Sequence, residues 1–382
     1  MRKIALVSVW NHNYGSLLQT FAIQNYLNAN GMQNEIIHYK DTNIVRKLAR
    51  FANYTYLKAK LNIVYRDLKL KIYYPFLYSE IIIRSNKFEN FKKNKLNFTE
   101  KIIGRKKLIK RIKTFDAVVL GSDQVWHPAN LLMNYFTLSF VPDHIAKIAY
   151  APSFGVSKIP LLQRNRTKAY LNRFNHISVR EFTGQNIVKS LTNREVEIVC
   201  DPTLLIDINQ WDLLKGNNRI LKEKYILCYY LGNNPSHREF ALNLKKATNH
   251  RIVCLQQLDE FIKSDITFGD LKPFDIDPAD FLNLIAHAEY VLTDSFHATI
   301  FSILYNKLFF TFYRFKEGKS ESTNTRITSI LNQFNLNDRK LSGNEDVQDC
   351  LKRTIDHENV HLKLNEIKQS SNNYLQNSLL NI

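Results

Sequence analysis

The sequence lacks several features that would place it in a broad class at once. It has no run of about 18 or more uninterrupted apolar residues, and polar Asn11, His12 and Asn13 come too early for a secretory signal. We therefore expect a cytoplasmic protein without a membrane-spanning segment. The four cysteines are widely scattered, which favours neither a disulfide framework nor a CxxC metal site. Reduced and mostly buried thiols are expected, and catalysis without a metal is the simpler hypothesis.

The glycine-rich fingerprint of dinucleotide binding is also missing. The first predicted strand, Ile4 to Val9, is followed by Asn13-Tyr14-Gly15-Ser16 and not by GxGxxG. The chain nevertheless repeats one arrangement, in which an apolar strand leads into a short polar turn and then a helix. Apolar runs without alternation are typical of strands that are covered on both faces of a parallel sheet. The pattern predicts an α/β fold.

The length and the strand pattern predict two Rossmann-like domains with parallel sheets. A chain of 382 residues exceeds one typical core. We expect an N-terminal domain over residues 1–206, a C-terminal domain over residues 207–342 and a helical segment over residues 343–382 with a frayed tail after Ser370. The expected strands are Ile4–Val9, Glu35–Tyr39, Phe115–Leu120, Ile145–Ala151, His176–Val179, Val196–Val199, Tyr225–Leu231, Arg251–Leu255, Tyr290–Leu292 and Leu308–Phe312.

Positive charge is concentrated in one part of the first domain. Residues 43–113 hold 20 Lys and Arg against four acidic residues, so this segment carries +16 of the formal net charge of +18. It is predicted to be a helical insertion that Pro75 interrupts. Its interspersed aromatic residues fit an anionic membrane surface, on the inner face of the membrane, but nucleic acid is not expected because no recognition motif accompanies them. A solvated helical insertion that keeps the protein soluble explains the same composition.

The stretch from Val291 to Asn306 is the strongest candidate for a ligand site. A short apolar strand ends at Thr293-Asp294-Ser295, and apolar residues then resume at helical spacing. In a parallel sheet such a turn lies where ligands collect, and the helix start offers N–H groups and a positive dipole end to an anion. His297 falls in the first helical turn. The simpler interpretation is a capped helix with a half-buried histidine.

An ordered series of strand-end motifs resembles the polysaccharide pyruvyl transferase family. The motifs are Asn13-Tyr14-Gly15-Ser16, Gly121-Ser122-Asp123-Gln124-Val125-Trp126, Tyr150-Ala151-Pro152-Ser153-Phe154-Gly155, Ser178-Val179-Arg180-Glu181, Asp201-Pro202-Thr203-Leu204, Asp294-Ser295-Phe296-His297, and Arg326-Ile327 with Asp338-Arg339. The resemblance implies two Rossmann-like domains facing across a cleft, similar to GT-B glycosyltransferases. It also implies transfer of a pyruvyl group from phosphoenolpyruvate to a sugar, as in exopolysaccharide biosynthesis.

The resemblance carries His297 over as the candidate general acid. Forming a pyruvate ketal needs a proton at the methylene carbon of phosphoenolpyruvate, and histidine suits this step. The helix dipole disfavours an imidazolium here, whereas a bound phosphoenolpyruvate favours it, so the donor would charge its own acid. Some family members have an arginine where this chain has Ser295, so the positive charge must come from elsewhere. The expected donor-binding residues are Ser295, Phe296, Asp294, Arg326, Arg180 and Arg314.

The saccharide acceptor is expected to bind the N-terminal domain, where it could be lipid-linked. The candidate residues are Asn13, Gly15, Gln124, Trp126 and Ser153, with Asp123 as the base for the attacking hydroxyl. Trp126 would offer a flat face to a sugar ring. The simpler interpretation is that Asp123 caps a helix and Trp126 packs in the core.

Two other functions stay open from the sequence. A GT-B glycosyltransferase would bind the diphosphate of a nucleotide sugar at the same kind of helix start. A non-catalytic scaffold on a membrane surface would use residues 43–113. No cofactor is expected beyond phosphoenolpyruvate as the donor substrate.

Overall fold

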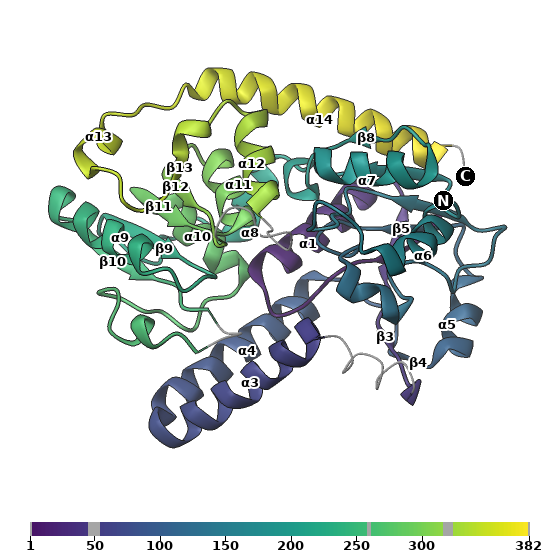
Figure 1. Cartoon of the computed structure of the whole chain (residues 1–382), viewed down its shortest axis with the longest axis horizontal. Helices are drawn as coiled ribbons and strands as arrows, with labels where there is room; N and C mark the ends of the chain where they lie inside the picture. The colour runs from purple at the N-terminus through teal and green to yellow at the C-terminus, as the bar shows by residue number, and fades with distance from the viewer. Residues whose placement is uncertain (1, 45–53, 258–260, 316–323, 381–382) are drawn as a thin grey trace. The chain divides into compact units, whose positions relative to one another are not determined.

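The computed structural model describes residues 2–44, 54–257, 261–315 and 324–380, except for the side chains of residues 54–56, 58–60 and 132 (Figure 1). The chain divides into two compact units. The first unit comprises Met1–Ala59, Lys92–Ile206 and Asn365–Ile382, and the second comprises Lys60–Phe91 and Asp207–Leu364. The division at residue 206 coincides with the expected boundary.

The first unit is built on a six-stranded parallel sheet in the order β2-β1-β5-β6-β7-β8. Its strands are β1 (Lys3–Val7), β2 (Gln33–Ile36), β5 (Ala117–Leu120), β6 (Ala146–Ala149), β7 (His176–Val179) and β8 (Glu197–Ile198), and a small second sheet pairs β3 (Tyr39–Lys40) with β4 (Ile102–Ile103). Its helices are α1 (Tyr14–Ala29), α5 (Arg105–Ile112), α6 (Leu161–Leu171) and α7 (Phe182–Thr192), with 3-10 turns at Pro128–Met133 and Pro202–Leu204.

The second unit repeats this design with a five-stranded parallel sheet in the order β10-β9-β11-β12-β13. Its strands are β9 (Tyr225–Tyr229), β10 (Arg251–Cys254), β11 (Tyr290–Thr293), β12 (Leu308–Phe312) and β13 (Lys340–Leu341). Its helices are α8 (Ile208–Lys215), α9 (Pro235–Thr248), α10 (Pro278–His287), α11 (Phe296–Leu304), α12 (Asn324–Gln333) and α13 (Val347–Leu351), with α3 (Tyr54–Tyr73) and α4 (Pro75–Lys95) added from the basic segment. Turns of 3-10 helix lie at Lys263–Ile266 and Asn337–Arg339.

Each sheet has a point where its strand order reverses. In the first sheet the chain runs from β1 outward to β2 and then returns to add β5 on the other side of β1. In the second sheet β10 and β11 flank β9 in the same way. Ligands of open α/β sheets bind at the carboxyl ends of the strands beside such a reversal. The fold therefore marks the β1–β5 and β9–β11 crevices as candidate sites, one within each unit.

The strands are as deeply buried as their apolar runs predict. All of Ala117–Leu120 and Tyr225–Tyr229 is buried, because helices cover both faces of each sheet. The α/β class with parallel sheets is confirmed. The four cysteines are free and buried, also as expected. Within the described ranges, no helix combines the length and hydropathy needed to cross a membrane.

Most of the basic segment belongs to the second unit and not, as expected, to the first. Pro75 does interrupt it, at the first position of α4, and Figure 1 shows α3 and α4 side by side as a helical hairpin. The sequence placed this insertion in the first domain, yet Lys60–Phe91 groups with the second unit. The buried guanidinium of Arg84 explains this, since it donates to the carbonyl oxygens of Gln256, Pro273 and Phe274 at 2.6 to 3.0 Å. Residues 45–53 of the segment lie outside the described residues.

The C-terminal helix α14 (His357–Leu380) also departs from the expectation. It continues to Leu380 and does not fray after Ser370, because its last turns pack on the first unit. The Ser371 hydroxyl accepts the backbone N–H of Cys200 at 2.9 Å, and the Tyr374 hydroxyl donates to the carbonyl oxygen of Ala149 at 3.1 Å. Leu375 and Leu379 are fully buried beside them.

Candidate functional site

The start of α11 forms the candidate site of the second unit. Ser295 is the N-cap residue, and its hydroxyl oxygen accepts the backbone N–H of Ala298 at 3.5 Å. Accepting this bond leaves the hydroxyl proton to donate elsewhere. His297 is 6% exposed, and its ring meets that of Phe296 edge to face with centroids 5.2 Å apart. A buried imidazole thus lies in the first turn of a helix that begins at the carboxyl end of β11.

Asp294 precedes this helix and holds the β9–β11 crevice together. Its carboxylate accepts the backbone N–H of Leu231 at 2.6 Å and that of Gly232 at 2.8 Å, both in the turn after β9. A methyl group on Gly232 would lie 2.8 Å from the same carboxylate, so the approach of the two loops requires glycine. Burial raises the pKa of Asp294, while Arg314 and the two N–H groups oppose that shift. Both carboxylate oxygens accept backbone N–H groups, which favours a structural role, and donor binding by Asp294 stays a prediction.

Two of the three candidate arginines lie at the start of α11. The Arg314 Nε atom is 4.0 Å from the Asp294 carboxylate, and its Nη2 atom donates to the Asp294 carbonyl oxygen at 3.4 Å. The Arg326 guanidinium, from the first turn of α12, lies 5.7 Å from the centre of the Phe296 ring. Positive charge from the turn after β12 and from the start of α12 therefore gathers where Ser295 supplies none.

Arg180 belongs to a different environment, inside the first unit. Its Nη1 atom lies 2.6 Å from a carboxylate oxygen of Asp201, and its Nε atom lies 3.6 Å from Glu181. All three side chains are buried. Asp201 also accepts the Ser122 hydroxyl at 3.1 Å, which joins the ends of β5, β7 and β8. Arg180 is thus a partner of buried carboxylates in the first unit, and its role in binding the donor stays a prediction.

Asp123 lies at the crevice of the first unit, directly after β5. Its carboxylate accepts the Ser16 hydroxyl at 2.8 Å and the backbone N–H of Gln124 at 2.9 Å. Ser16 belongs to α1, which follows β1, so this bond spans the reversal point of the sheet. Asp123 is partly exposed and adopts a left-handed backbone with φ of 73°. Such a conformation is uncommon for a residue with a side chain and is frequent at functional turns.

The other expected acceptor residues divide into two groups. Asn13 and Gln124 are partly exposed near Asp123, where Asn13 caps α1 by accepting the backbone N–H of Ser16 at 3.3 Å. Gly15 is buried in the first turn of α1. Ser153 is fully buried, and its hydroxyl donates to Glu181 at 2.5 Å. Ser153 is therefore part of the buried network at the ends of β6 and β7.

Trp126 is a core residue of the first unit. It is buried among Phe154, Tyr170 and Phe174, with ring centroids 5.2 to 5.7 Å away, and its indole N–H donates to the Phe136 carbonyl oxygen at 3.2 Å. No face of the ring remains for a sugar. The expectation of a sugar platform is corrected, because the aromatic residues of α6 and of the turn after β6 cover the indole.

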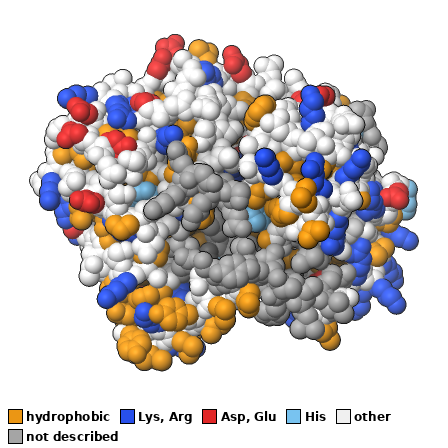
Figure 2. Space-filling model, viewed as in Figure 1, with side chains coloured by type: hydrophobic (Ala, Val, Ile, Leu, Met, Phe, Trp, Pro, Cys, Tyr) orange, Lys and Arg blue, Asp and Glu red, His pale blue; other side chains and the backbone are white. Residues whose placement is uncertain are grey.

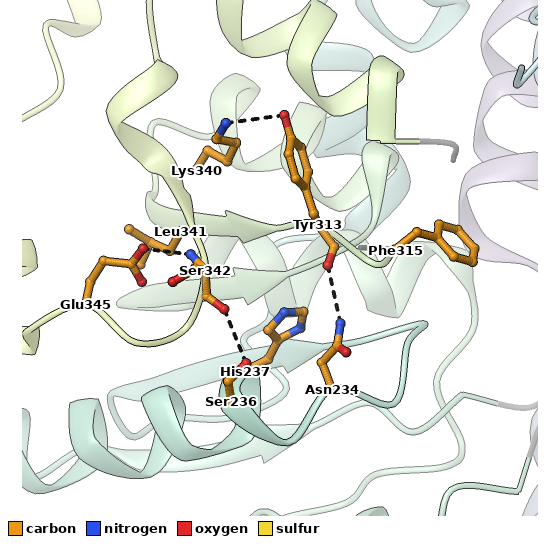
Figure 3. A pocket seen from close by; sticks show the side chains of 9 residues that line it. All are labelled: Asn234, Ser236, His237, Tyr313, Phe315, Lys340, Leu341, Ser342 and Glu345. Atoms are coloured by element: carbon orange, nitrogen blue, oxygen red, sulfur yellow. Dashed lines mark hydrogen bonds between the residues drawn. The ribbon is translucent and has the colours of Figure 1, made fainter. Parts of the chain in front are cut away.

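The second unit also contains an open pocket of about 420 Å³ that the sequence did not indicate (Figure 3). It lies where the start of α9 meets the turns after β12 and β13, and its lining residues include Ser236, His237, Tyr313, Lys340 and Glu345. Burial lowers the pKa of His237 to about 4, with a further contribution from Arg238. A neutral imidazole therefore forms part of the pocket wall. The sequence does contain one signal for this pocket, the polar turn Asn233-Asn234-Pro235 that follows the predicted strand Tyr225–Leu231.

One motif near the C-terminus has the spacing of a metal site, contrary to the expectation of catalysis without a metal. His357-Glu358-Asn359-Val360-His361 has HExxH spacing and lies at the start of α14. His361 is exposed, and its Nε2 atom is 2.9 Å from the side-chain oxygen of Asn306. Among the residues that the structure describes, no group of three or more His, Cys, Asp or Glu side chains is placed to hold a metal ion.

The fold and the two crevices define an α/β protein of the GT-B type. UDP-N-acetylglucosamine 2-epimerase from Rickettsia bellii is similar in structure, with a TM-score of 0.51 and 11% identity over 100% of this chain and 96% of that chain. UDP-GlcNAc 2-epimerase from Neisseria meningitidis gives a TM-score of 0.46 and 12% identity, over 100% of this chain and 100% of that chain. ADP-heptose LPS heptosyltransferase II from E. coli gives a TM-score of 0.38 and 10% identity, over 97% of this chain and 100% of that chain.

Sequence comparison gives the family. The model of the polysaccharide pyruvyl transferase family matches residues 13–314, and the chain belongs to this family. It is accordingly a transferase. A comparison with curated proteins gives no match.

Proposed function

We propose that this protein transfers the pyruvyl group of phosphoenolpyruvate to saccharide hydroxyls and forms a pyruvate ketal, with His297 as general acid. The observation that carries the proposal is the start of α11, where a buried histidine, a capping serine hydroxyl and two arginines gather beside the β9–β11 reversal. Family membership supports the reaction class. No cofactor enters the proposal.

The reaction balances with one acid and two sugar hydroxyls. The imidazolium of His297 gives a proton to the methylene carbon of phosphoenolpyruvate, which leaves C2 electron-poor. One hydroxyl oxygen attacks C2 and loses its proton. The second hydroxyl oxygen then displaces inorganic phosphate, and its proton accompanies the leaving phosphate. The products are the cyclic ketal and phosphate, so the only groups required are an acid, a base and cations for the phosphate.

Each group has a candidate among the described residues. The start of α11 suits an anion because backbone N–H groups and the positive dipole end point toward the carboxyl edge of the sheet. Arg314 and Arg326 supply positive charge for the phosphate or the carboxylate. Asp123 is the proposed base for the attacking hydroxyl, with Asn13 and Gln124 beside it as hydrogen-bonding groups for the sugar.

The substitution His297→Gln tests the assignment of the acid. Glutamine keeps the size and polarity of the side chain but cannot deliver a proton, so transfer should fall by a factor on the order of 10² to 10⁴ while the fold is retained. The assay is phosphate release from phosphoenolpyruvate in the presence of oligosaccharides with neighbouring hydroxyl pairs, followed by phosphorus NMR. Circular dichroism checks the fold.

His361→Gln is the matched control, since it makes the same substitution at an exposed histidine of the second unit. It should leave transfer unchanged. Near-normal turnover of His297→Gln would remove the histidine from the mechanism. Saturation-transfer NMR with phosphoenolpyruvate and with a mixture of nucleotide sugars tests the donor, and binding of a nucleotide sugar alone would favour a glycosyltransferase.

A further inference from the structure

An apolar stripe runs along the solvent side of α3. Leu61, Val64, Tyr65, Leu68 and Ile72 are each 55% to 66% exposed. Their spacing of three or four residues places them on one helical face about 100° wide. Figure 2 shows hydrophobic side chains gathered over the hairpin of α3 and α4. A contiguous apolar surface of this kind marks an interaction site on a soluble domain.

The stripe continues at the corner of the hairpin and is separate from the face that packs. Tyr73 and Phe76 extend it and are 69% and 71% exposed. Leu70 lies on the opposite side of α3 and is 3% exposed, because this side faces the rest of the second unit. Arg84 of α4 fixes the hairpin through its bonds to three carbonyl oxygens. The stripe is therefore presented by a hairpin that is already packed through its other face.

Positive charge borders the stripe on both sides. Helical spacing of 100° per residue places Lys69 on one flank and Lys71 on the other. The Lys69 ammonium lies 4.9 Å from the centre of the Tyr65 ring, and that of Lys71 lies 4.9 Å from the Tyr78 ring. The acidic residue of this helix, Asp67, pairs with Arg66 at 2.7 Å. An apolar centre with cationic flanks matches a helix that lies in the interface of a bilayer with its lysines reaching the headgroups.

We propose that the α3–α4 hairpin docks on an anionic lipid bilayer, with the stripe from Leu61 to Phe76 entering the interface. The positive charge of the hairpin is the reason to propose an anionic bilayer as its partner. Residues 54–95, which form the hairpin, hold 10 Lys and Arg against three acidic residues, a net charge of +7 that favours anionic headgroups and disfavours a second copy of the same hairpin. The proposal goes beyond the transferase reaction and requires neither donor nor acceptor, so it can fail or succeed separately from the proposed chemistry.

Vesicle sedimentation with the full-length protein tests the docking. Vesicles of phosphatidylcholine with about a third phosphatidylglycerol should bind the protein at low salt, and binding should weaken several-fold in high salt and on pure phosphatidylcholine. The double variant Leu68→Ser with Ile72→Ser should lower the partition coefficient roughly tenfold or more, because two side chains no longer enter the interface. Both positions are exposed, so the fold should be unaffected.

The matched control is Leu161→Ser with Leu162→Ser, which removes two exposed apolar side chains, 80% and 100% exposed, from α6 of the first unit. This control should bind vesicles as the unmodified protein does. Equal binding by the stripe variant, or no binding to anionic vesicles, would overturn the proposal. So would a dimer in light scattering that the stripe variant converts to monomer, since the stripe would then be a contact between copies.

Discussion

The two units place an aspartate at the same point of the same topology and use it differently. Asp123 follows β5 and Asp294 follows β11, and in both sheets this is the strand on the far side of the reversal. Asp123 is partly exposed and accepts a side-chain hydroxyl and a neighbouring N–H group. Asp294 is 1% exposed and accepts two N–H groups from the turn after β9.

The difference favours a structural role for Asp294 and is compatible with the proposed role of Asp123 as the base. A carboxylate that solvent reaches can exchange its hydroxyl partner for a ligand. A carboxylate that is itself buried and accepts two backbone N–H groups cannot release them without a large penalty. We therefore expect the ligand-binding groups of the second unit among the neighbours of Asp294, at the start of α11.

The largest effect that tests this comparison is expected for Asp294→Asn. At this buried position the amide nitrogen of asparagine would face a backbone N–H group. The free energy of unfolding should therefore fall by about 2 to 4 kcal/mol, although burial already disfavours the ionised carboxylate. Asp123→Asn should cost less than about 1 kcal/mol, because the Ser16 hydroxyl can turn and accept from the amide. Urea denaturation measures both values.

Transfer activity is the second property in which the substitutions of Asp123 and Asp294 should differ. Asp123→Asn should retain stability and lose transfer, since an amide cannot accept the proton of the attacking hydroxyl. If Asp123→Asn were the more destabilising substitution, or if it kept normal transfer, the division of roles between the two aspartates would be wrong.

A smaller effect is expected from the pH dependence of stability in the second unit. The pKa of His237 is lowered from 6.5 to about 4, so the unfolded chain binds a proton below pH 6.5 that the folded chain resists until about pH 4. The stability that the neutral side chain contributes is present above pH 6.5 and is lost as the pH falls toward 4. Between pH 7 and pH 5 the loss should be about 2 kcal/mol.

His237→Phe isolates this contribution from other titrating groups. The imidazole stacks on Phe312 with ring centroids 4.4 Å apart, and phenylalanine can keep that contact without titrating. Urea denaturation at both pH values should show a smaller loss in the variant than in the unmodified protein. An identical loss in both proteins would show that His237 is protonated as easily in the folded chain as in the unfolded chain.

A modest loss of stability with no change in acceptor binding is expected for Trp126→Phe in the first unit. The indole is buried among three aromatic rings, so the smaller ring should cost about 1 to 2 kcal/mol of stability and leave the KM for the saccharide unchanged. Steady-state kinetics with varied oligosaccharide measures the KM. A several-fold increase in the KM without loss of stability would restore Trp126 as a sugar platform.

Local sequence pattern is enough to predict the strands and helices that border the candidate crevices. Apolar runs without alternation predicted strands such as Ala117–Leu120, and the apolar spacing from Ile300 to Leu304 predicted α11. These predictions succeed because the backbone period and the burial of one face are local properties of the chain. The position of His297 in the first helical turn follows from them directly.

The contacts of each side chain, in contrast, depend on how the whole unit packs. Trp126, Arg180 and Asp294 were all reasonable ligand-binding residues by type and position, yet their partners come from segments far apart in the sequence. The α3–α4 hairpin joined the second unit because Arg84 meets carbonyl groups some 170 to 190 residues away. Local pattern specifies which face of an element is buried, but the distant segment that covers this face is specified by packing of the whole unit.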